Sequence, residues 1–182
     1  MRALLLAACL LPAWSAAPAA AAEKTATLEE NVKTAFIYKF TRYVEWPAAA
    51  PGEDFRIGVI GDGGVLAPLR ELAREKLVNG ARIKVEQLRG PEEIGRCRIL
   101  FVSRSEGGRL EEIVKAVGQK GILTVADSPG FAARGVAINF VLEGGKLRFE
   151  INRKAAARAG LEISSQLLKL AILVEEGANE KR

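Results

Sequence analysis

The sequence contains no histidine, and it has only two cysteines among 182 residues. Histidine is the commonest general base and the commonest transition-metal ligand, so its absence excludes serine–histidine and cysteine–histidine hydrolases. One mature thiol without an imidazole is also too few ligands for a typical zinc site. No apolar run reaches the roughly 20 residues that span a bilayer. We therefore expect no metal, no cofactor and no membrane-spanning segment.

The composition that remains is that of one ordinary globular domain, with 49% hydrophobic and 27% charged residues. A chain of this length buries roughly 70% of the surface that its unfolded form exposes, so its core needs no disulfide. The formal net charge is +5. Lys and Arg alternate with Glu, as at residues 70–71 and 74–76, whereas a nucleic-acid-binding protein would cluster its cations. We expect no nucleic-acid partner.

Residues 1–22 have the pattern of a cleaved secretory signal. Arg2 is the single charge, an apolar run extends from Ala3 to Trp14, and small residues precede Glu23. Cleavage near Ala22 would leave an exported protein, so we expect a periplasmic location.

The mature chain shows no repeat and no low-complexity linker. We predict one domain over residues 27–176, followed by a flexible tail over residues 177–182. Cys97 is the only cysteine of this domain and stands just before the apolar residues 99–102. We interpret it either as a buried thiol at the start of a strand or, in an oxidising compartment, as part of an intermolecular disulfide.

The first part of the domain alternates helical and strand patterns. A capping box at residues 27–30 predicts a helix that ends at Trp46-Pro47. Further helices are predicted at residues 65–77 and 110–117, and strands at residues 55–60, 82–86, 99–102 and 122–125. The continuously apolar run 99–102 is typical of a strand covered on both faces of a parallel sheet. Alternating strands and helices indicate an α/β layered sheet.

The C-terminal part has a different pattern. Residues 136–141 and 146–151 flank Glu143-Gly144-Gly145 and predict a β-hairpin added to the sheet. Asn152 is placed to cap a short helix over residues 153–159, and Ser164 is placed to cap a last one. The predicted fold class is thus α/β, a single three-layer domain. Its mixed, largely parallel sheet is flanked by helices and carries a C-terminal hairpin and two C-terminal helices.

The last predicted helix is apolar on more than one face. One stripe consists of Leu167, Leu170, Ala171 and Val174. Leu168 and Ile172 form a second stripe at the same four-residue spacing. If these two side chains are exposed, their patch marks an oligomer or partner surface.

No motif provides convincing catalytic chemistry. The run Gly61-Asp62-Gly63-Gly64 between a strand and a helix suggests a phosphate loop. However, Leu66 stands where the dinucleotide fingerprint requires its third glycine, and no Gly-Lys-Ser/Thr follows. A simple turn is the favoured interpretation, as it is for residues 127–130. Carboxylate pairs are adjacent and diverge on a helix. We expect a binding protein with no catalytic residues.

Five aromatic residues lie on or near the first predicted helix: Phe36, Tyr38, Phe40, Tyr43 and Trp46. They point in several directions, so they cannot all face one core. Core packing explains Phe36 and Phe40. Tyr43 and Trp46 are either further core residues or contacts for a partner.

Several segments together resemble the YfiR-like family of bacterial periplasmic proteins. They are residues 33–40 (KTAFIYKF), 44–47 (VEWP), Cys97 with its apolar run, 122–127 (ILTVAD) before Phe131, 149–152 (FEIN) and 160–168 (GLEISSQLL). They cover nearly the whole mature chain. Their combination is specific, although each segment alone is not.

The resemblance implies a periplasmic repressor that holds the sensor domain of an inner-membrane diguanylate cyclase inactive. It thereby implies control of cyclic-di-GMP signalling and biofilm formation. An outer-membrane peptidoglycan-binding lipoprotein is the implied releasing partner, and the implied oligomer is a homodimer. The family prototype also carries cysteines around its hairpin that this chain lacks, so redox switching by that bond is impossible here.

Two alternatives remain open beside repression. The first is a periplasmic small-molecule sensor that binds an aromatic amino acid and acts on another receptor or sensor kinase. The second is an enzyme with an unobvious carboxylate or serine site. For the repressor we predict partner contacts at Leu168, Ile172, Glu175, Tyr43 and Trp46.

Overall fold

The computed structural model describes residues 17–47 and 52–177, with side chains from Thr27 onward. Most of the predicted signal and of the tail therefore lies outside the described residues. The described helices are α1 (Ala17–Phe40), α2 (Leu66–Glu75), α3 (Leu110–Val117), α4 (Arg153–Arg158) and α5 (Ser165–Leu168), with short 3-10 helices η1 (Pro91–Arg96) and η2 (Arg104–Gly108). None of them is long and apolar enough to cross a membrane.

Within residues 17–47 and 52–177, ten strands form two sheets. The strands are β1 (Val44–Glu45), β2 (Phe55–Ile60), β3 (Leu77–Val78), β4 (Ala81–Leu88), β5 (Ile99–Val102), β6 (Leu123–Ala126), β7 (Ile138–Glu143), β8 (Lys146–Ile151), β9 (Glu162–Ile163) and β10 (Ile172–Leu173). Eight of them pair in the order β10-β8-β7-β6-β5-β2-β4-β3. All neighbours are parallel except β7–β8 and β3–β4. The predicted α/β class is confirmed.

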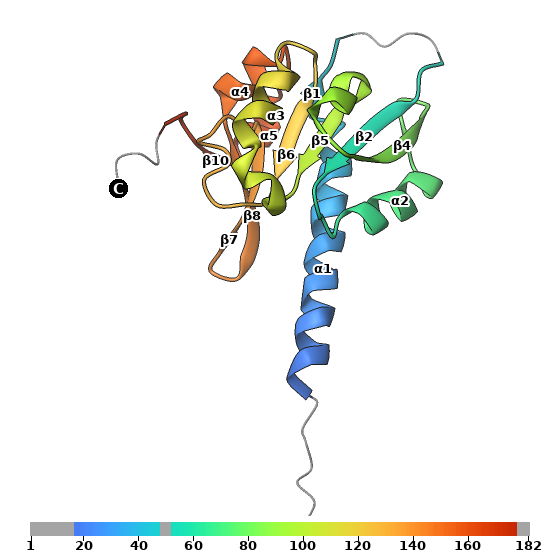
Figure 1. Cartoon of the computed structure of the whole chain (residues 1–182), viewed down its shortest axis with the longest axis vertical. Helices are drawn as coiled ribbons and strands as arrows, with labels where there is room; N and C mark the ends of the chain where they lie inside the picture. The colour runs from blue at the N-terminus through green and yellow to red at the C-terminus, as the bar shows by residue number, and fades with distance from the viewer. Residues whose placement is uncertain (1–16, 48–51, 178–182) are drawn as a thin grey trace, which may run out of the picture.

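Helices cover both faces of this sheet (Figure 1). α1 packs beside α2, and α3 packs beside η1. In Figure 1, α3 lies in front of the sheet while α1 passes behind it, and the N-terminal part of α1 extends below the domain. The carboxyl ends of the parallel strands point toward that same lower side. α1 therefore lies next to the strand ends where α/β proteins commonly bind ligands.

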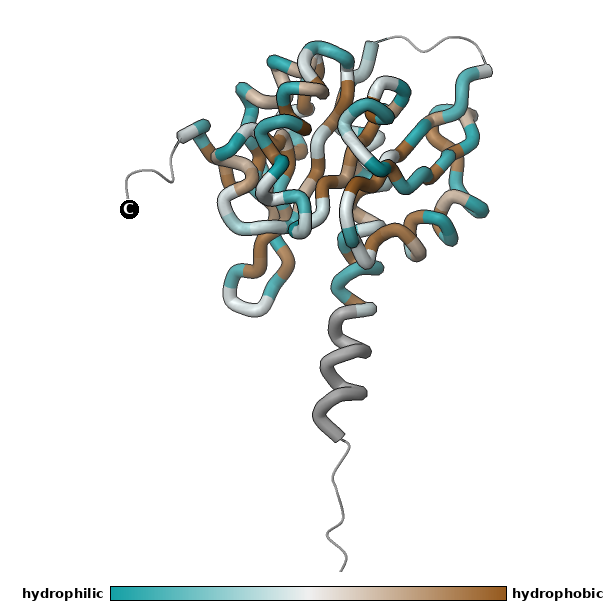
Figure 2. Tube along the Cα trace, viewed as in Figure 1, coloured by the Kyte–Doolittle hydropathy of each residue, from teal (hydrophilic) through white to brown (hydrophobic). Residues whose placement is uncertain are grey.

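The core follows the central strands, and the hydrophobic residues in Figure 2 concentrate along them. β5 is buried at every position and lies in the middle of the sheet, as its apolar run predicted. Four phenylalanines attach α1 to the hairpin, with ring centroids 5.5–6.2 Å apart: Phe36, Phe40, Phe140 and Phe149. The core interpretation of Phe36 and Phe40 is thus correct.

The hairpin and the two predicted caps are also confirmed. β7 and β8 pair in register from Ile138↔Ile151 to Glu143↔Lys146, so the strand begins two residues later than predicted. The Asn152 side chain accepts a hydrogen bond from the Ala155 N–H and caps α4. Ser164 caps α5 in the same way.

The boundaries predicted for the first helix are wrong. α1 begins at Ala17 instead of Thr27, because the alanine-rich sequence before the capping box continues the helix. It ends at Phe40, where a turn leads into β1. Tyr43 and Trp46 therefore follow the helix. Leu77, predicted at the end of the second helix, begins β3 instead.

The last predicted helix is wrong in a way that affects the candidate surface. α5 contains only four residues, and Ile172 belongs to β10, which pairs in parallel with β8. The Val174 N–H continues this pairing by donating to the Ile151 carbonyl. Pairing with an open sheet edge is the tertiary contact that overrides the helical spacing of the apolar residues. Leu168 and Ile172 therefore do not form a helical stripe.

Candidate functional site

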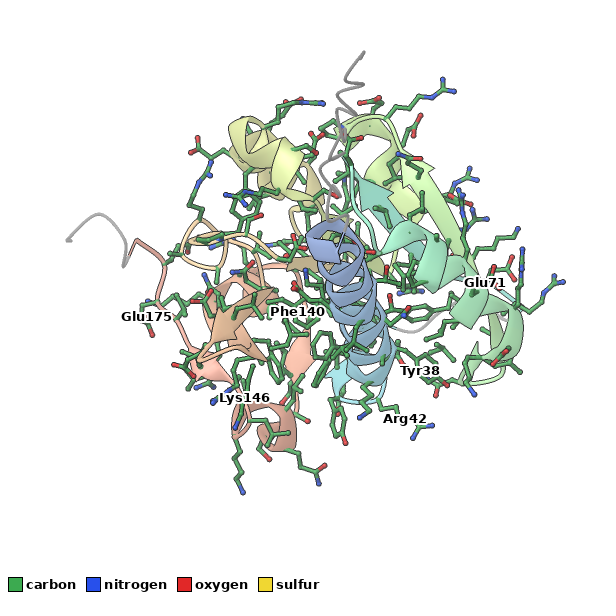
Figure 3. All side chains as sticks on the ribbon, turned by 90° about the horizontal axis from the view of Figure 1, so that it is seen from below. Tyr38, Arg42, Glu71, Phe140, Lys146 and Glu175 are labelled. Carbon is green, nitrogen blue, oxygen red and sulfur yellow. The ribbon has the colours of Figure 1, made fainter. Side chains whose placement is uncertain are left out.

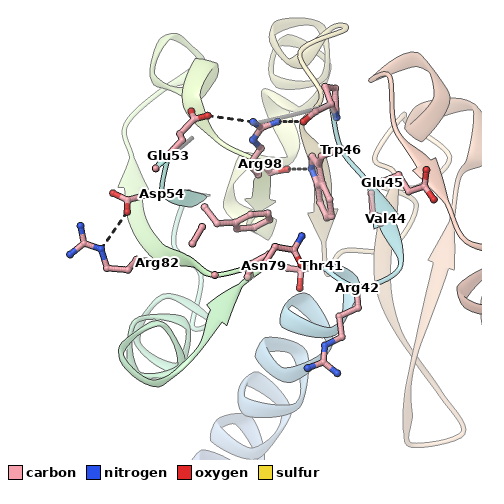
Figure 4. A pocket seen from close by; sticks show the side chains of 16 residues that line it. Thr41, Arg42, Val44, Glu45, Trp46, Glu53, Asp54, Asn79, Arg82 and Arg98 are labelled. Atoms are coloured by element: carbon pink, nitrogen blue, oxygen red, sulfur yellow. Dashed lines mark hydrogen bonds and ion pairs between the residues drawn. The ribbon is translucent and has the colours of Figure 1, made fainter. Parts of the chain in front are cut away.

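A cavity of about 1060 Å³ lies at the amino ends of β2 and β4. Figure 4 shows its lining side chains, which come from the end of α1, from β1, and from the segments around Phe55 and Arg82. Trp46, one of the predicted contact residues, is part of this lining. The cavity therefore joins segments that the sequence analysis had treated separately.

Trp46 is held on two sides. Its indole N–H donates a 3.0 Å hydrogen bond to the Arg98 carbonyl. Its ring stands edge-on to Phe55, with centroids 5.5 Å apart and an interplanar angle of 85°. An aromatic ring fixed in this way at a cavity wall offers an apolar surface to a planar ligand.

Charged groups surround the cavity and mostly pair with one another. The Arg98 guanidinium donates to the Pro47 carbonyl and lies 3.5 Å from Glu53. Asp54 pairs with Lys84, and the hydrogen bond from that ammonium lowers the pKa of Asp54. Within the described part of the chain, Arg42 has no ion pair.

The other predicted contacts belong to a second region, at the sheet edge formed by β10. Leu168 and Ile172 are half-buried there, and Glu175 is exposed. Between them lie two exposed leucines that the sequence analysis did not select, Leu170 at 65% and Leu173 at 57% exposure. We call these five residues the C-terminal edge surface.

Ion pairs fix the chain beyond this surface to α4. Lys154 and Glu175 are 2.6 Å apart, and both oxygens of Glu176 accept 2.8 Å hydrogen bonds from Arg158. The hydrogen bond from Arg158 lowers the pKa of Glu176. Exposed apolar side chains that lie close together on a surface are typical of a docking site.

The structure brings together only some of the predicted residues. Tyr43 lies beside the segment that leads to Leu168, because its carbonyl accepts a 2.8 Å hydrogen bond from the Ser164 N–H. The antiparallel pair β1–β9 supports this contact. Trp46 instead lines the cavity, and Glu175 lies on the opposite side of the domain from Arg42 (Figure 3). The five contact residues predicted from the sequence thus divide between the cavity and the region of the C-terminal edge surface.

A buried ion pair was missed by the sequence analysis. Lys33 of α1 lies 2.8 Å from Asp127, directly after β6, and 2.7 Å from Glu29 one turn earlier on the same helix. Burial alone would lower the pKa of Lys33, but the hydrogen bonds to the two carboxylates outweigh it and raise that pKa. Both residues occur in the segments that carry the family resemblance.

The acidic side chains and Cys97 are the remaining candidate groups for metal binding or reactivity. No three Asp, Glu, Cys or His side chains within the described ranges are grouped as metal ligands. Cys97 is buried beside Gly58, and burial raises the pKa of its thiol to about 11. The buried-thiol interpretation is therefore correct, and an intermolecular disulfide is incompatible with this burial.

Comparison with known proteins assigns the family. The YfiR/HmsC-like family matches residues 30–172. The chain belongs to this family. Its members regulate other proteins and are not catalysts. The match extends to Ile172, the first residue of β10, and includes most of the side chains described above.

One solved structure supports the fold. A conserved domain protein from Vibrio cholerae O1 biovar El Tor strain N16961 is similar to this chain, with a TM-score of 0.55 and 12% sequence identity. The similarity covers 79% of this chain and 59% of the Vibrio chain, so our chain spans less than two thirds of that structure. No curated protein matches the sequence.

Proposed function

We propose that this protein acts in the periplasm as a repressor of an inner-membrane diguanylate cyclase, by binding the cyclase's periplasmic sensor domain. The family match over residues 30–172 carries this proposal. A binding protein without catalytic groups acts on a membrane receptor only by preferring one of its conformations. Repression then requires that this chain bind the inactive form of the cyclase more tightly than the active form.

The C-terminal edge surface is our candidate for the contact. Leu173 lies on the edge strand β10 and Leu170 lies just before it, and both are exposed. The outer side of β10 has no neighbour within the described sheet. Covering two leucines that are more than half exposed contributes favourable free energy of roughly 1–3 kcal/mol each when burial is complete. Release by an outer-membrane lipoprotein with a peptidoglycan-binding domain fits this scheme if that lipoprotein competes for the same surface.

The test compares matched substitutions on the two ends of the sheet. Leu170→Glu/Leu173→Glu changes exposed side chains, whereas changing half-buried Leu168 or Ile172 would also disturb the core. Leu77→Glu on β3 is the control, because Leu77 is 54% exposed at the opposite edge. Each variant complements a deletion strain of the native bacterium, and cyclic-di-GMP is measured with a fluorescent reporter.

We expect wild type and Leu77→Glu to lower cyclic-di-GMP and to crosslink to a protein with a diguanylate cyclase domain. The edge double variant should be secreted and folded but do neither. An unchanged cyclic-di-GMP level with wild type would reject repression. A fully active double variant would instead reject the C-terminal edge surface as the contact.

The cavity supports a second candidate function, a sensor of an aromatic amino acid. Trp46 and Phe55 offer an aromatic wall, and Arg42 offers a cation for a carboxylate at the cavity rim. Calorimetry with tryptophan as the probe tests this function. We expect Trp46→Ala to abolish binding. Equal heats for the variant and the wild type would reject the cavity as the site.

A further inference from the structure

The carboxyl ends of β2 and β5 form the place where the winding of the sheet reverses. From β2 the chain continues through α2 to β4 on one side, and from β5 it continues through α3 to β6 on the other side. Doubly wound proteins bind anionic ligands in the crevice at such a reversal. Residues 61–64 after β2 and Ser103 after β5 lie at this reversal.

The N-terminus of α2 faces this crevice without a cap of its own. Its N-cap residue is Val65, which makes no side-chain hydrogen bond, and its first turn contains no acidic residue. A ten-residue helix carries a partial positive charge at such an end and favours an anion there.

A carboxylate from another helix already occupies this position. The Glu30 side chain of α1 lies against Gly64 so closely that any Cβ at position 64 would overlap its carboxylate. A larger residue at position 64 would therefore displace the Glu30 carboxylate. Residues 61–64, which the sequence analysis considered as a phosphate loop, lack the residue spacing of a nucleotide-binding motif. Their backbone nevertheless lies next to an anionic group, the Glu30 carboxylate.

A buried donor adjoins the same loop and has no partner. Ser103 is 1% exposed, and its Oγ makes no hydrogen bond within the described structure. A methyl group on Gly63 would come within 2.5 Å of this Oγ, so the hydroxyl lies directly against the loop. Buried hydroxyls without partners are unusual and suggest a group that is absent. Thr34 and Ser128 have unpaired buried hydroxyls as well.

From this arrangement we propose that the crevice is a binding site for a phosphate-type oxyanion and that Glu30 is its built-in competitor. An oxyanion that displaces the Glu30 carboxylate would accept hydrogen bonds from the Ser103 hydroxyl and from the N–H groups of Gly64, Val65 and Ala67. The Leu66 N–H already donates to the Gly63 carbonyl, and Pro68 has no N–H. Because Glu30 belongs to α1, binding would also separate this side chain of α1 from the loop before α2. This site is independent of the partner surface proposed above.

The experiment titrates the mature protein with inorganic phosphate and, separately, with glycerol 3-phosphate, to distinguish the free ion from a phosphomonoester. Binding is followed by calorimetry and by the amide NMR shifts of residues 61–66. Glu30→Ala removes the competitor, whereas Glu30→Gln keeps its bulk. Glu75→Ala, at the far end of α2, removes the same charge away from the crevice.

We expect Glu30→Ala to bind at least one of the two anions about tenfold more tightly than wild type. Glu30→Gln and Glu75→Ala should show no such gain, and adding Ser103→Ala to Glu30→Ala should remove it. Wild type at high phosphate should show the same amide shifts, which provides a readout without any substitution. Equal affinities of Glu30→Ala and Glu75→Ala, or a gain that persists without Ser103, would overturn the proposal.

Discussion

Lys33 on α1 donates a 2.8 Å hydrogen bond to Asp127, which lies 94 residues further along the chain. The pair connects the first helix to the carboxyl end of β6. Since the Lys33 side chain is 9% exposed, its ammonium depends on Asp127 and Glu29 to replace water. This ion pair attaches α1 to the end of β6 through polar side chains. The phenylalanine cluster attaches the same helix to the hairpin through apolar side chains.

Removing the partner of Lys33 should destabilise the domain strongly. We expect Asp127→Asn to lower the free energy of unfolding by about 3 kcal/mol, because an incompletely compensated buried charge remains. Urea denaturation measures the change. Glu71→Gln, which disturbs the exposed pair with Arg74, is the control and should cost less than about 1 kcal/mol. Equal losses in the two variants would contradict the buried-pair interpretation.

The raised pKa of Lys33 predicts a loss of stability in alkali. A group whose pKa is higher in the folded state stabilises the fold below its unfolded value, here 10.5, and loses that contribution as the pH rises through the folded value. The free energy of unfolding should therefore fall more steeply above pH 10.5 in wild type than in Lys33→Met. Parallel pH curves for the two proteins would show that the ammonium is not stabilised by folding.

The sequence predicted the central strands and the hairpin well, because a short run of apolar residues or a turn motif is enough to specify them. A continuously apolar strand such as β5 and a two-glycine turn between β7 and β8 have few alternative structures. The Lys33–Asp127 pair could not be predicted in this way. Each residue alone resembles a solvated charge, and only the arrangement of α1 across the sheet brings the two together.

Cys97 should be chemically silent in the folded protein. With a thiol pKa of about 11, roughly one molecule in a thousand carries the thiolate at pH 8. We expect no reaction with dithionitrobenzoate in buffer and a rapid reaction in denaturant. Non-reducing electrophoresis of the mature protein should show no disulfide-linked dimer. A stoichiometric reaction in buffer would mean that the thiol is accessible.

The two helix caps should differ in their contribution to stability. Asn152 is fully buried, caps α4, and also donates a 2.7 Å hydrogen bond to the Ala132 carbonyl. Asn152→Ala should therefore cost about 2–3 kcal/mol. Ser164 is half-buried and caps only a four-residue helix, so Ser164→Ala should cost about 0.5–1 kcal/mol. Thermal denaturation measures both, and the reverse order would contradict this reasoning.

Acid should weaken the ion pair between Glu176 and Arg158, and with it the amide protection of the last described residue, Gly177. Because the pKa of Glu176 is lower in the folded state, its pairing with Arg158 stabilises the fold above the unfolded value of 4.5 and is lost as the pH falls. Amide exchange at Gly177, whose N–H donates to the Ala133 carbonyl, reports this loss. After correction for intrinsic rates, protection should decrease below pH 4.5 in wild type. In Glu176→Gln it should be low at every pH.

The C-terminal region shows why the candidate surface was only partly predictable. Leu167, Leu168 and Ile172 satisfy a helical period, and nothing local signals that β8 leaves an open edge for β10. The surface residues selected from the sequence lie in the correct segment. However, the exposed Leu170 and Leu173 were not selected. Leu170 was placed in the first apolar stripe and Leu173 in neither stripe, because exposure at an edge strand depends on the pairing register.

The phenylalanine cluster also determines when the protein can fold. α1 is among the first segments to leave the ribosome, yet its aromatic side chains pack against Phe140 and Phe149, which leave about 100 residues later. Until then, α1 can pack against α2 but not against the hairpin, so this part of the core stays open while the chain is synthesised. An export channel that accepts only unfolded polypeptide would thus receive a chain whose hydrophobic core is still incomplete.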